Sequence, residues 1–201
     1  FATFEKEPIA SASIGQVHRA TLRDGTHVAV KVQHPGVDRQ IEVDLEILTG
    51  LAQLADRIPE LQPYRPSATT AELRRMLRRE LDFGRELRNQ QQFATMFAGD
   101  QRVVIPSTYP ELSSSKVLTM QWLEGMKLSK VAIGNSTAAR FATYARHGAE
   151  VYLKMIFEHG VYHADPHPGN IVLLDDAIGL DHLESHDQGD HGLPPWCPCQ
   201  V

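Results

Sequence analysis

The chain has 201 residues, of which 42% are hydrophobic and 22% charged, and its formal net charge is −5. This length supports one sizeable core in one or two domains of about 100–200 residues each. The composition excludes disordered, collagen-like and disulfide-stapled classes. The charge gives no general attraction to nucleic acid, and no run reaches the ~18 apolar residues of a membrane-spanning helix.

The first half of the chain predicts a hairpin followed by two helices. Residues 9–20 and 27–33 flank Asp24-Gly25, a strong hairpin signal. Apolar residues recur at helical spacing over 37–54, which predicts one amphipathic helix. Thr69-x-x-Glu72 is a candidate capping box for a second, long helix over 67–98.

The second half predicts an antiparallel strand pair, a helix and a short hairpin. The paired strands are expected at 103–106 and 117–122, and the short hairpin at 171–174 and 177–180. The helix is expected over 138–158. The residues expected on its inward face are Phe141, Ala142, Ala145, Ala149, Tyr152 and Ile156.

The clearest chemical signal is the loop at residues 163–170, His-Ala-Asp-Pro-His-Pro-Gly-Asn. Asp165 and Asn170 are five residues apart, the separation found in the H-R-D-x-x-x-x-N catalytic loop of protein kinases. In that loop Asp meets the acceptor hydroxyl and Asn holds magnesium. An oxygen-only pair suits Mg²⁺, and the two prolines stiffen the loop.

Two other interpretations of this loop stay open. Asp165 can instead cap an ordinary turn in which the histidines bond to the backbone. His163 and His167 are four residues apart, like a zinc pair on a helix, but Pro166 and Pro168 oppose a helix here.

Two further segments fit phosphate chemistry. Val28-Ala29-Val30-Lys31 matches the kinase strand whose Lys faces the nucleotide phosphates and is steadied by a helix Glu. The ordinary alternative is a solvated lysine at a strand end. Residues 10–17 stand where a kinase carries G-x-G-x-x-G-x-V, but only Gly15 and Val17 match. Small side chains and free amides permit phosphate contact in a stiffer loop.

Together these segments resemble the UbiB-like family of atypical protein-kinase-like proteins, also called ADCK or aarF-domain proteins. The resemblance spans about residues 5–180 and is carried by residues 8–18, 28–33, 80–86 and 163–170. It implies an α+β, protein-kinase-like fold. An N-lobe with an antiparallel sheet and helices would precede the start of a helical C-lobe, with nucleotide bound in the cleft.

The resemblance also implies roles for individual residues. The catalytic residues would be Asp165, Lys31 and Glu86, with Glu86 as the ion-pair partner of Lys31. The nucleotide contacts would be Ala12, Ser13, Lys31, Met120 and Trp122, the last two from an interlobe hinge at 120–123. Asn170 and Asp181 would hold Mg²⁺, with Asp181 as a remnant of the D-F-G aspartate. Glu80 and Asp82 match the acidic E-x-D motif of the family.

The predicted organisation is an N-lobe at 1–123, a partial C-lobe at 124–181 and a tail at 182–201. The chain begins at Phe1, and the family's Lys/Gln-containing N-terminal extension is not in it, so we expect truncation at both ends. The tail contains three His and both Cys. We expect it to be disordered and unrelated to the family, with a soft-metal site as the alternative to disorder. A frame disruption or fusion just after Leu180 would explain its origin, and a specialised tail is the alternative.

The implied function is binding of ATP and Mg²⁺ by an atypical kinase or ATPase domain. Such domains resemble regulators of ubiquinone and isoprenoid-lipid biosynthesis, and we expect little or no turnover in this form. Isoprenoid lipid or lipid-biosynthesis proteins are the implied partners, and the implied location is cytoplasmic or peripheral to a membrane.

Three alternatives remain. The first is a pseudokinase scaffold whose helices at 37–58 and 67–98 form a partner surface. The second is an active protein kinase, which the loss of the Gly-rich loop opposes. The third is a nonfunctional truncated product with a poorly covered apolar face on the helix at 138–158.

Overall fold

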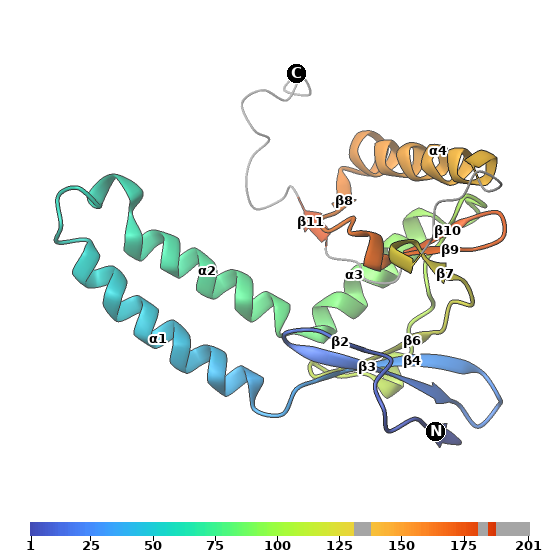
Figure 1. Ribbon diagram of the computed structural model, residues 1–201, viewed down its shortest axis with the longest axis horizontal. Coiled ribbons are helices and arrows are strands. Elements are labelled where there is room, and N and C mark those ends of the chain that lie inside the picture. Colours follow the sequence, from blue (N-terminus) through green and yellow to red (C-terminus); the bar gives the residue numbers. More distant parts are fainter. Residues whose placement is uncertain (131–137, 181–184, 188–201) are drawn as a thin grey trace. The chain divides into compact units, whose positions relative to one another are not determined.

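The computed structural model describes residues 1–130, 138–180 and 185–187 and has an α+β fold (Figure 1). The chain divides into two compact units. The first comprises Phe1–Leu87 and Tyr109–Met120, and the second comprises Arg88–Thr108 and Gln121–Val201. The division at Met120 falls within the predicted hinge. Residues 88–108, expected in the N-lobe, belong to the second unit because Phe93 and Phe97 are buried in its core.

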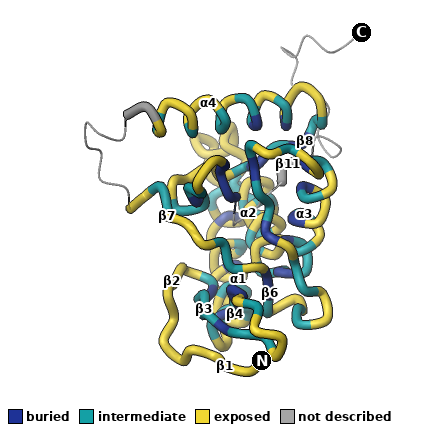
Figure 2. The backbone as a smooth tube through the Cα atoms, turned by 90° about the vertical axis from the view of Figure 1, so that its right-hand side faces the viewer, coloured by how far each residue is buried: buried dark blue, intermediate teal, exposed yellow. Residues whose placement is uncertain are grey.

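The sheet of the first unit has the strand order β1-β3-β4-β6, and β2 also pairs with β3. The strands are β1 (Thr3–Phe4), β2 (Ala10–Ser11), β3 (Gly15–Thr21), β4 (His27–Gln33) and β6 (Val117–Gln121). The predicted hairpin is confirmed as β3 and β4, which are antiparallel with Gly15 opposite Gln33. In its turn the Thr26 N–H donates to the Asp24 carboxylate at 3.0 Å. Ala20, Val28 and Val30 are buried at the centre of this sheet (Figure 2).

Two helices of the first unit form a hairpin of their own (Figure 1). They are α1 (Val37–Ala55) and α2 (Pro66–Glu80). The prediction for 37–54 is confirmed by α1, which buries Leu45 and Ala52. The two helices are joined by an ion pair between Arg78 and Glu42 at 2.7 Å, and the Ser67 hydroxyl donates to Asp56 at the tip.

The prediction of one long helix over 67–98 is wrong, because α2 ends at Glu80 and a separate helix, α3 (Phe83–Met96), follows. The break occurs where the Asp82 carboxylate accepts a hydrogen bond from the Gly84 N–H at 3.0 Å, which is the bond of a helix cap.

The predicted capping box is also wrong. Helix α2 already begins at Pro66, and the Thr69 hydroxyl donates to the Tyr64 carbonyl. Glu72 pairs with Arg75 instead of reaching back to the helix start. Proline is well suited to the first helical position, where no N–H is needed.

The sheet of the second unit has the order β5-β10-β9-β7. The strands are β5 (Val103–Val104), β7 (Met126–Lys127), β9 (Ile171–Leu173) and β10 (Ile178–Leu180). The predicted short hairpin is confirmed by β9 and β10, which are antiparallel. Strand β8 (Val161–His163) pairs with β11 (Ser185–Asp187), which lies in the segment predicted to be a disordered tail.

The predicted antiparallel pairing of 103–106 with 117–122 is wrong. Strand β5 pairs with β10 in parallel, whereas β6 lies next to β4. Pro106, which has no N–H, follows shortly after β5. Beyond it the chain does run beside β6, where the Tyr109 N–H donates to the Thr119 carbonyl at 2.9 Å.

The predicted helix at 138–158 is confirmed as α4 (Ala138–Lys154), which continues as a π-helical turn, η5 (Met155–His159). Its inward face is rotated by about one position from the prediction. Val151 and Met155 are buried and Tyr144 packs on this core, whereas the predicted inward residues Ala142, Ala145, Ala149 and Ile156 are exposed. The inward positions are those that bury apolar surface against Phe93 and Phe97.

Part of the apolar surface near the end of this helix is uncovered in the described structure. Leu153 is 53% exposed and Phe157 is 73% exposed. Among the helices of the described residues, none has the length and hydropathy needed to cross a bilayer.

Candidate functional site

In the first unit, strand β4 and helix α3 bring Lys31 and Glu86 together. The Lys31 ammonium donates to the Glu86 carboxylate at 2.7 Å, and the two side chains are only 12% and 9% exposed. The ammonium also lies 4.7 Å from the centre of the Phe83 ring, within the range of a cation–π interaction. The lysine side chain is held beside Glu86, because moving away would leave two nearly buried charges unpaired at a high cost in free energy.

The start of α3 is fixed to the sheet by Gln33, which sequence reasoning missed. Gln33 is 8% exposed, and its amide donates to the Leu81 carbonyl. The Phe83 N–H donates to the Ser115 carbonyl at 3.0 Å. Glu86 lies one helical turn beyond Phe83, so these bonds determine where its carboxylate points. The sequence shows Gln33 two residues after Lys31 on the same strand, but its burial and its backbone partner appear only in the structure.

The loop between β2 and β3 contains Ala12 and Ser13, both exposed. The Ala12 N–H donates to the Gly15 carbonyl at 2.8 Å, and its carbonyl accepts a bond from the His34 ring at 2.9 Å. One of the amides expected to be free is therefore used inside the turn. His34, which sequence reasoning did not single out, also fixes this loop.

Gly15 itself is required for space rather than for a special backbone angle. A Cβ atom there would lie 2.6 Å from the Val32 carbonyl oxygen and 3.3 Å from the Phe83 ring. Any side chain would push β3 away from β4 and from the ring beside Lys31.

The two residues of the acidic motif occupy different environments. Glu80 is exposed at the end of α2, whereas Asp82 is half-buried and caps α3 through the Gly84 N–H. The cap gives Asp82 a structural function in positioning the helix that carries Glu86.

In the second unit, Asp165 and Asn170 lie in the loop between β8 and β9. The Asn170 side-chain amide donates to the Asp165 carboxylate at 3.0 Å and to the Asp165 carbonyl at 3.2 Å. This use of the amide nitrogen leaves the Asn170 side-chain oxygen as the acceptor. Asp165 is exposed and Asn170 is half-buried. Together they offer carboxylate and amide oxygens, the donors that Mg²⁺ prefers.

Both histidines of the loop are directed at backbone amides of the same loop. His163 is 1% exposed, and its Nδ1 accepts a bond from the Asp165 N–H at 3.4 Å. The Nδ1 of His167 accepts from the Gly169 N–H at 3.0 Å, at the start of the short helix η6 (Pro168–Asn170). Hydrogen bonds of this kind are what the turn interpretation expects, in which the histidines bond to the backbone. In the described part of the chain no group of three or more His, Cys, Asp or Glu side chains is placed to hold a metal.

Tyr152, on α4, supports the loop from outside the motif. Its hydroxyl donates to the carbonyl of His163, and burial raises the pKa of the phenol, with smaller contributions from Tyr162 and Asp165. The sequence analysis placed Tyr152 on an inward helix face but gave it no partner, because the partner is a backbone atom of β8.

The remaining predicted site residues are only partly described. Met120 is buried and is the last residue of the first unit. Trp122 is half-buried and belongs to the second unit, whose second stretch begins at Gln121. Asp181 lies outside the described residues.

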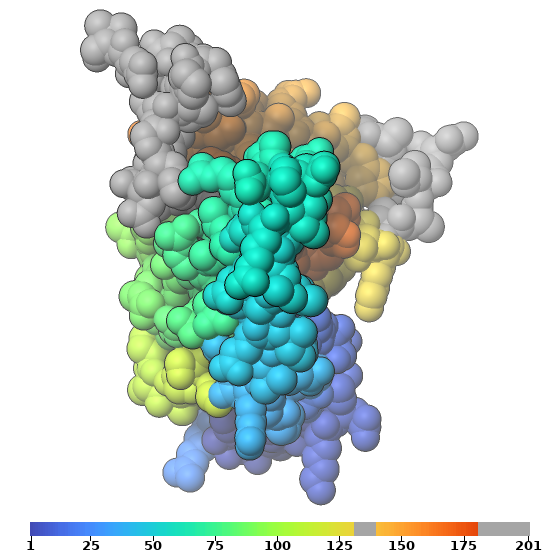
Figure 3. Space-filling model, turned by 90° about the vertical axis from the view of Figure 1, so that its left-hand side faces the viewer, coloured from blue at the N-terminus to red at the C-terminus, as the bar shows by residue number. Residues whose placement is uncertain are grey.

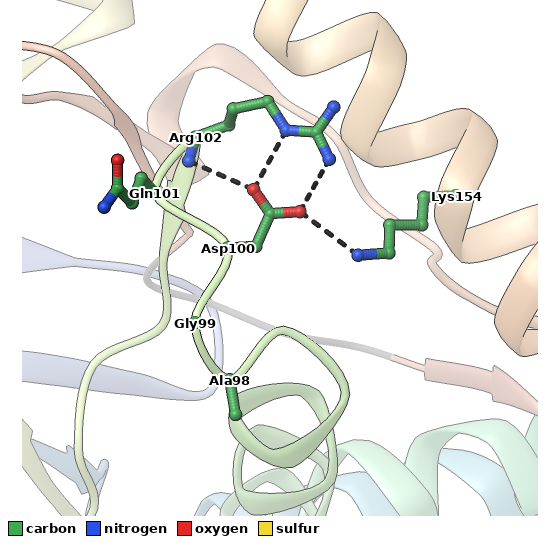
Figure 4. Close-up of a pocket in the computed structure, with 6 residues that line it drawn as sticks. All are labelled: Ala98, Gly99, Asp100, Gln101, Arg102 and Lys154. Carbon is green, nitrogen blue, oxygen red and sulfur yellow. Dashed lines mark hydrogen bonds and ion pairs between the residues drawn. The ribbon is translucent and has the colours of Figure 1, made fainter.

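A polar cluster in the second unit joins the loop after α3 to helix α4 (Figure 4). Asp100 is within 2.7 Å of the Arg102 guanidinium and 3.2 Å of the Lys154 ammonium. Hydrogen bonds from Arg102 hold the pKa of the Asp100 carboxyl well below its usual range. Arg102 also pairs with Glu150 at 2.9 Å. Asp100, Arg102 and Lys154 border an open hollow of about 510 Å³. All three are ion-paired, so the cluster has a structural function.

Comparison with known proteins defines the class. A model described as the ABC1 atypical kinase-like domain matches residues 1–193, past the predicted family boundary at residue 181. Protein ACTIVITY OF BC1 COMPLEX KINASE 8, chloroplastic, of Arabidopsis thaliana is 37% identical over 89% of this chain and 24% of its own length. AarF domain-containing protein kinase 1 of Xenopus tropicalis is 35% identical over 90% of this chain and 36% of its own length.

The chain therefore belongs to the ABC1 family, which includes the UbiB-like, ADCK and aarF-domain proteins, and it spans about a quarter to a third of these two relatives.

Comparison with solved structures shows the fold. Rv3197 of Mycobacterium tuberculosis, solved as a complex with erythromycin, has a TM-score of 0.77 and 31% identity, covering 93% of this chain and 47% of Rv3197. The Rio2 kinase of Chaetomium thermophilum has a TM-score of 0.50 and 12% identity, covering 94% of this chain and 50% of that one. The fold is protein-kinase-like, as predicted.

Proposed function

We propose that this chain binds ATP together with Mg²⁺. The observation that carries the proposal is the buried 2.7 Å ion pair between Lys31 on β4 and Glu86 on α3. In protein kinases the corresponding strand lysine must be paired with a helix glutamate for the phosphates to be bound productively. Rio2, a protein of the same fold, was solved with ADP and Mg²⁺.

Asp165 and Asn170 are proposed to serve the metal and the reacting group. The Asn170 side-chain oxygen is proposed as a Mg²⁺ ligand, since its nitrogen donates to Asp165. Bound Mg²⁺ would neutralise charge on the phosphate oxygens. Asp165 would orient a water molecule or an acceptor hydroxyl. With one carboxylate and one amide, the pair suits an ion that keeps water and phosphate oxygens as its other ligands.

We further propose that turnover by this chain is weak or absent. The nucleotide-covering loop has lost most of its glycines, and the Ala12 N–H is used inside the loop. The family resemblance supports a role beside ubiquinone or other isoprenoid-lipid biosynthesis, with a lipid or a lipid-biosynthesis protein as partner.

The test is a thermal-shift titration of the chain with ATP and with ADP, each with and without Mg²⁺. A ligand that binds the folded state raises its stability, so we expect a magnesium-dependent shift in melting temperature. Lys31→Ala and Asn170→Ala should reduce it. Lys116→Ala is the control, because Lys116 forms an exposed ion pair with Asp38 in the first unit. A folded wild-type chain without any shift would refute nucleotide binding.

A scaffold without catalysis is the second candidate, and the surface of α1 favours it. Helix α1 packs against α2 with one side, while Val43, Ile47, Leu51 and Leu54 are each between 49% and 58% exposed. Side chains of both helices lie at the surface in Figure 3. ATP binding that Asp165→Asn leaves unchanged, with no measurable hydrolysis in either chain, would favour the scaffold. Magnesium-dependent hydrolysis, even slow, that Asp165→Asn removes would favour an enzyme.

A further inference from the structure

The loop that carries Asp165 and Asn170 is held at one peptide unit, that of Gly169. On the N–H side, the Nδ1 of His167 accepts the Gly169 N–H at 3.0 Å. On the carbonyl side, the Lys127 ammonium donates to the Gly169 oxygen at 2.8 Å. Gly169 directly precedes Asn170, so both contacts restrict the backbone from which the Asn170 side chain projects.

The position of Lys127 follows from strand register. Strand β7 lies antiparallel to β9 (Figure 1), and in their register Lys127 is opposite Val172. Because β9 begins at Ile171, directly after Asn170, the lysine side chain reaches back to the last turn of the loop. Lys127 is half-buried, and a charge-assisted hydrogen bond in such a place is stronger than a neutral one.

The other side of the peptide is equally restricted. A Cβ atom at position 169 would lie 3.0 Å from the Nδ1 of His167, so glycine allows the ring to approach the N–H closely. The hydrogen bond makes Nδ1 the acceptor of the ring. The Asn170 N–H then donates to the His167 carbonyl at 2.8 Å, and its side-chain amide donates to Asp165 at 3.0 Å.

We infer that Lys127 and His167 are positioning residues for the metal-binding pair, acting through the Gly169 peptide. The inference rests on the proposed binding of Mg²⁺ and ATP. Groups that orient a metal ligand without touching the metal typically change metal affinity by about 10–100-fold when they are removed. The lysine acts by holding a carbonyl in place and does not contact the nucleotide.

The experiment compares the dissociation constant for ATP in Mg²⁺ with that in EDTA for wild type, Lys127→Met and Lys127→Arg. In Lys127→Met we expect binding in Mg²⁺ to weaken about tenfold while binding in EDTA stays within about twofold. Lys127→Arg, which can still donate to the carbonyl, should recover most of the loss. Lys130→Met is the matched control, since Lys130 is an exposed lysine three residues further along.

A second pair of variants tests the other contact and covers the case in which Lys127→Met does not fold. His167→Asn keeps a short acceptor for the Gly169 N–H, so its ATP binding in Mg²⁺ should stay close to that of wild type. His167→Leu has no acceptor, so its ATP binding in Mg²⁺ should weaken about tenfold while binding in EDTA stays unchanged.

The outcomes separate the two proposals. Equal weakening of ATP binding in Mg²⁺ and in EDTA by Lys127→Met would mean that the lysine contacts phosphate, and it would overturn the positioning role. A normal magnesium effect in both Lys127→Met and His167→Leu would also overturn it, while leaving the proposed function intact. A wild-type chain whose ATP binding does not respond to Mg²⁺ would refute the proposed metal site and this inference together.

Discussion

The two pairs of predicted site residues, one in each unit, are constructed differently. Lys31 and Glu86 are nearly buried, and regular structure on both sides holds them: a paired strand and a capped helix. Asp165 and Asn170 are in a loop between short strands. Its backbone is fixed by single hydrogen bonds, two donated by Tyr152 and Lys127 and one accepted by His167. The Lys31–Glu86 pair depends on burial and is coupled to folding, whereas the Asp165–Asn170 pair depends on individual contacts and can be altered with little effect on stability.

Loss of Glu86 should have the largest effect on stability. Glu86→Ala leaves the Lys31 ammonium in a site where it is 12% exposed, and removing one partner of a buried pair costs about 3 kcal/mol. The measurement is the midpoint of urea unfolding.

The double variant Lys31→Met/Glu86→Leu is the control, because an apolar pair of similar volume should restore most of that stability. If Glu86→Ala is as stable as wild type, the contrast between the buried Lys31–Glu86 pair and the loop pair does not hold.

Asp100→Asn should cost about 2 kcal/mol, because it weakens charged hydrogen bonds from Arg102 and Lys154. The pKa of Asp100 is lowered in the folded state, so its contribution is complete above the unfolded pKa of about 3.9 and is lost as the pH falls through the folded value. The stability difference between wild type and Asp100→Asn should therefore be constant above about pH 5 and shrink in more acidic solution. A difference that grows on acidification would contradict this assignment.

Tyr152→Phe should cost about 1 kcal/mol, the typical value for one hydrogen bond whose buried acceptor loses its partner. The hydroxyl donates to the carbonyl of His163, so slow amide exchange near the start of the loop should also become faster. Tyr64→Phe is a matched control, since Tyr64 is 75% exposed. Equal melting temperatures and exchange rates in both variants would show that the loop does not need this support.

Asp165→Ala should have the smallest effect on stability, below about 0.5 kcal/mol, because substitutions of exposed side chains rarely cost more. The same variant should abolish the magnesium-dependent part of the ATP-induced shift in melting temperature. A large loss of stability without ligand would mean that this loop, like the Lys31–Glu86 pair, is part of the folding core.

The sequence predicted elements best where periodicity and turn residues agreed. The β3–β4 hairpin, α1 and the β9–β10 hairpin formed as expected. The sequence-based prediction was wrong where the same residues fit two structures. The apolar pattern of a helix continues through residues 81–82, yet Asp82 caps a new helix there. The parallel pairing of β5 with β10 joins strands more than seventy residues apart, and no local pattern specifies such a partner.

The candidate site shows the same limit. Spacing and residue type indicated Lys31, Glu86, Asp165 and Asn170, because phosphate and Mg²⁺ chemistry requires particular groups in a particular order along the chain. Gln33, Tyr152 and Lys127 were missed as supporting residues. Each acts through a backbone carbonyl of a distant segment, and every residue has such a carbonyl, so the sequence contains no signal for the partner.

The sequence by itself determined the family, the principal elements and the chemical groups of the candidate site, since these depend on residue identity and short-range spacing. The tertiary structure decided the face of α4 that is buried, the partners of β5 and β6, and the contacts that hold Glu86 and Asn170 in place. These features depend on the packing of segments far apart in the chain, where burial of apolar surface and pairing of backbone polar groups select one arrangement among several that local preferences allow.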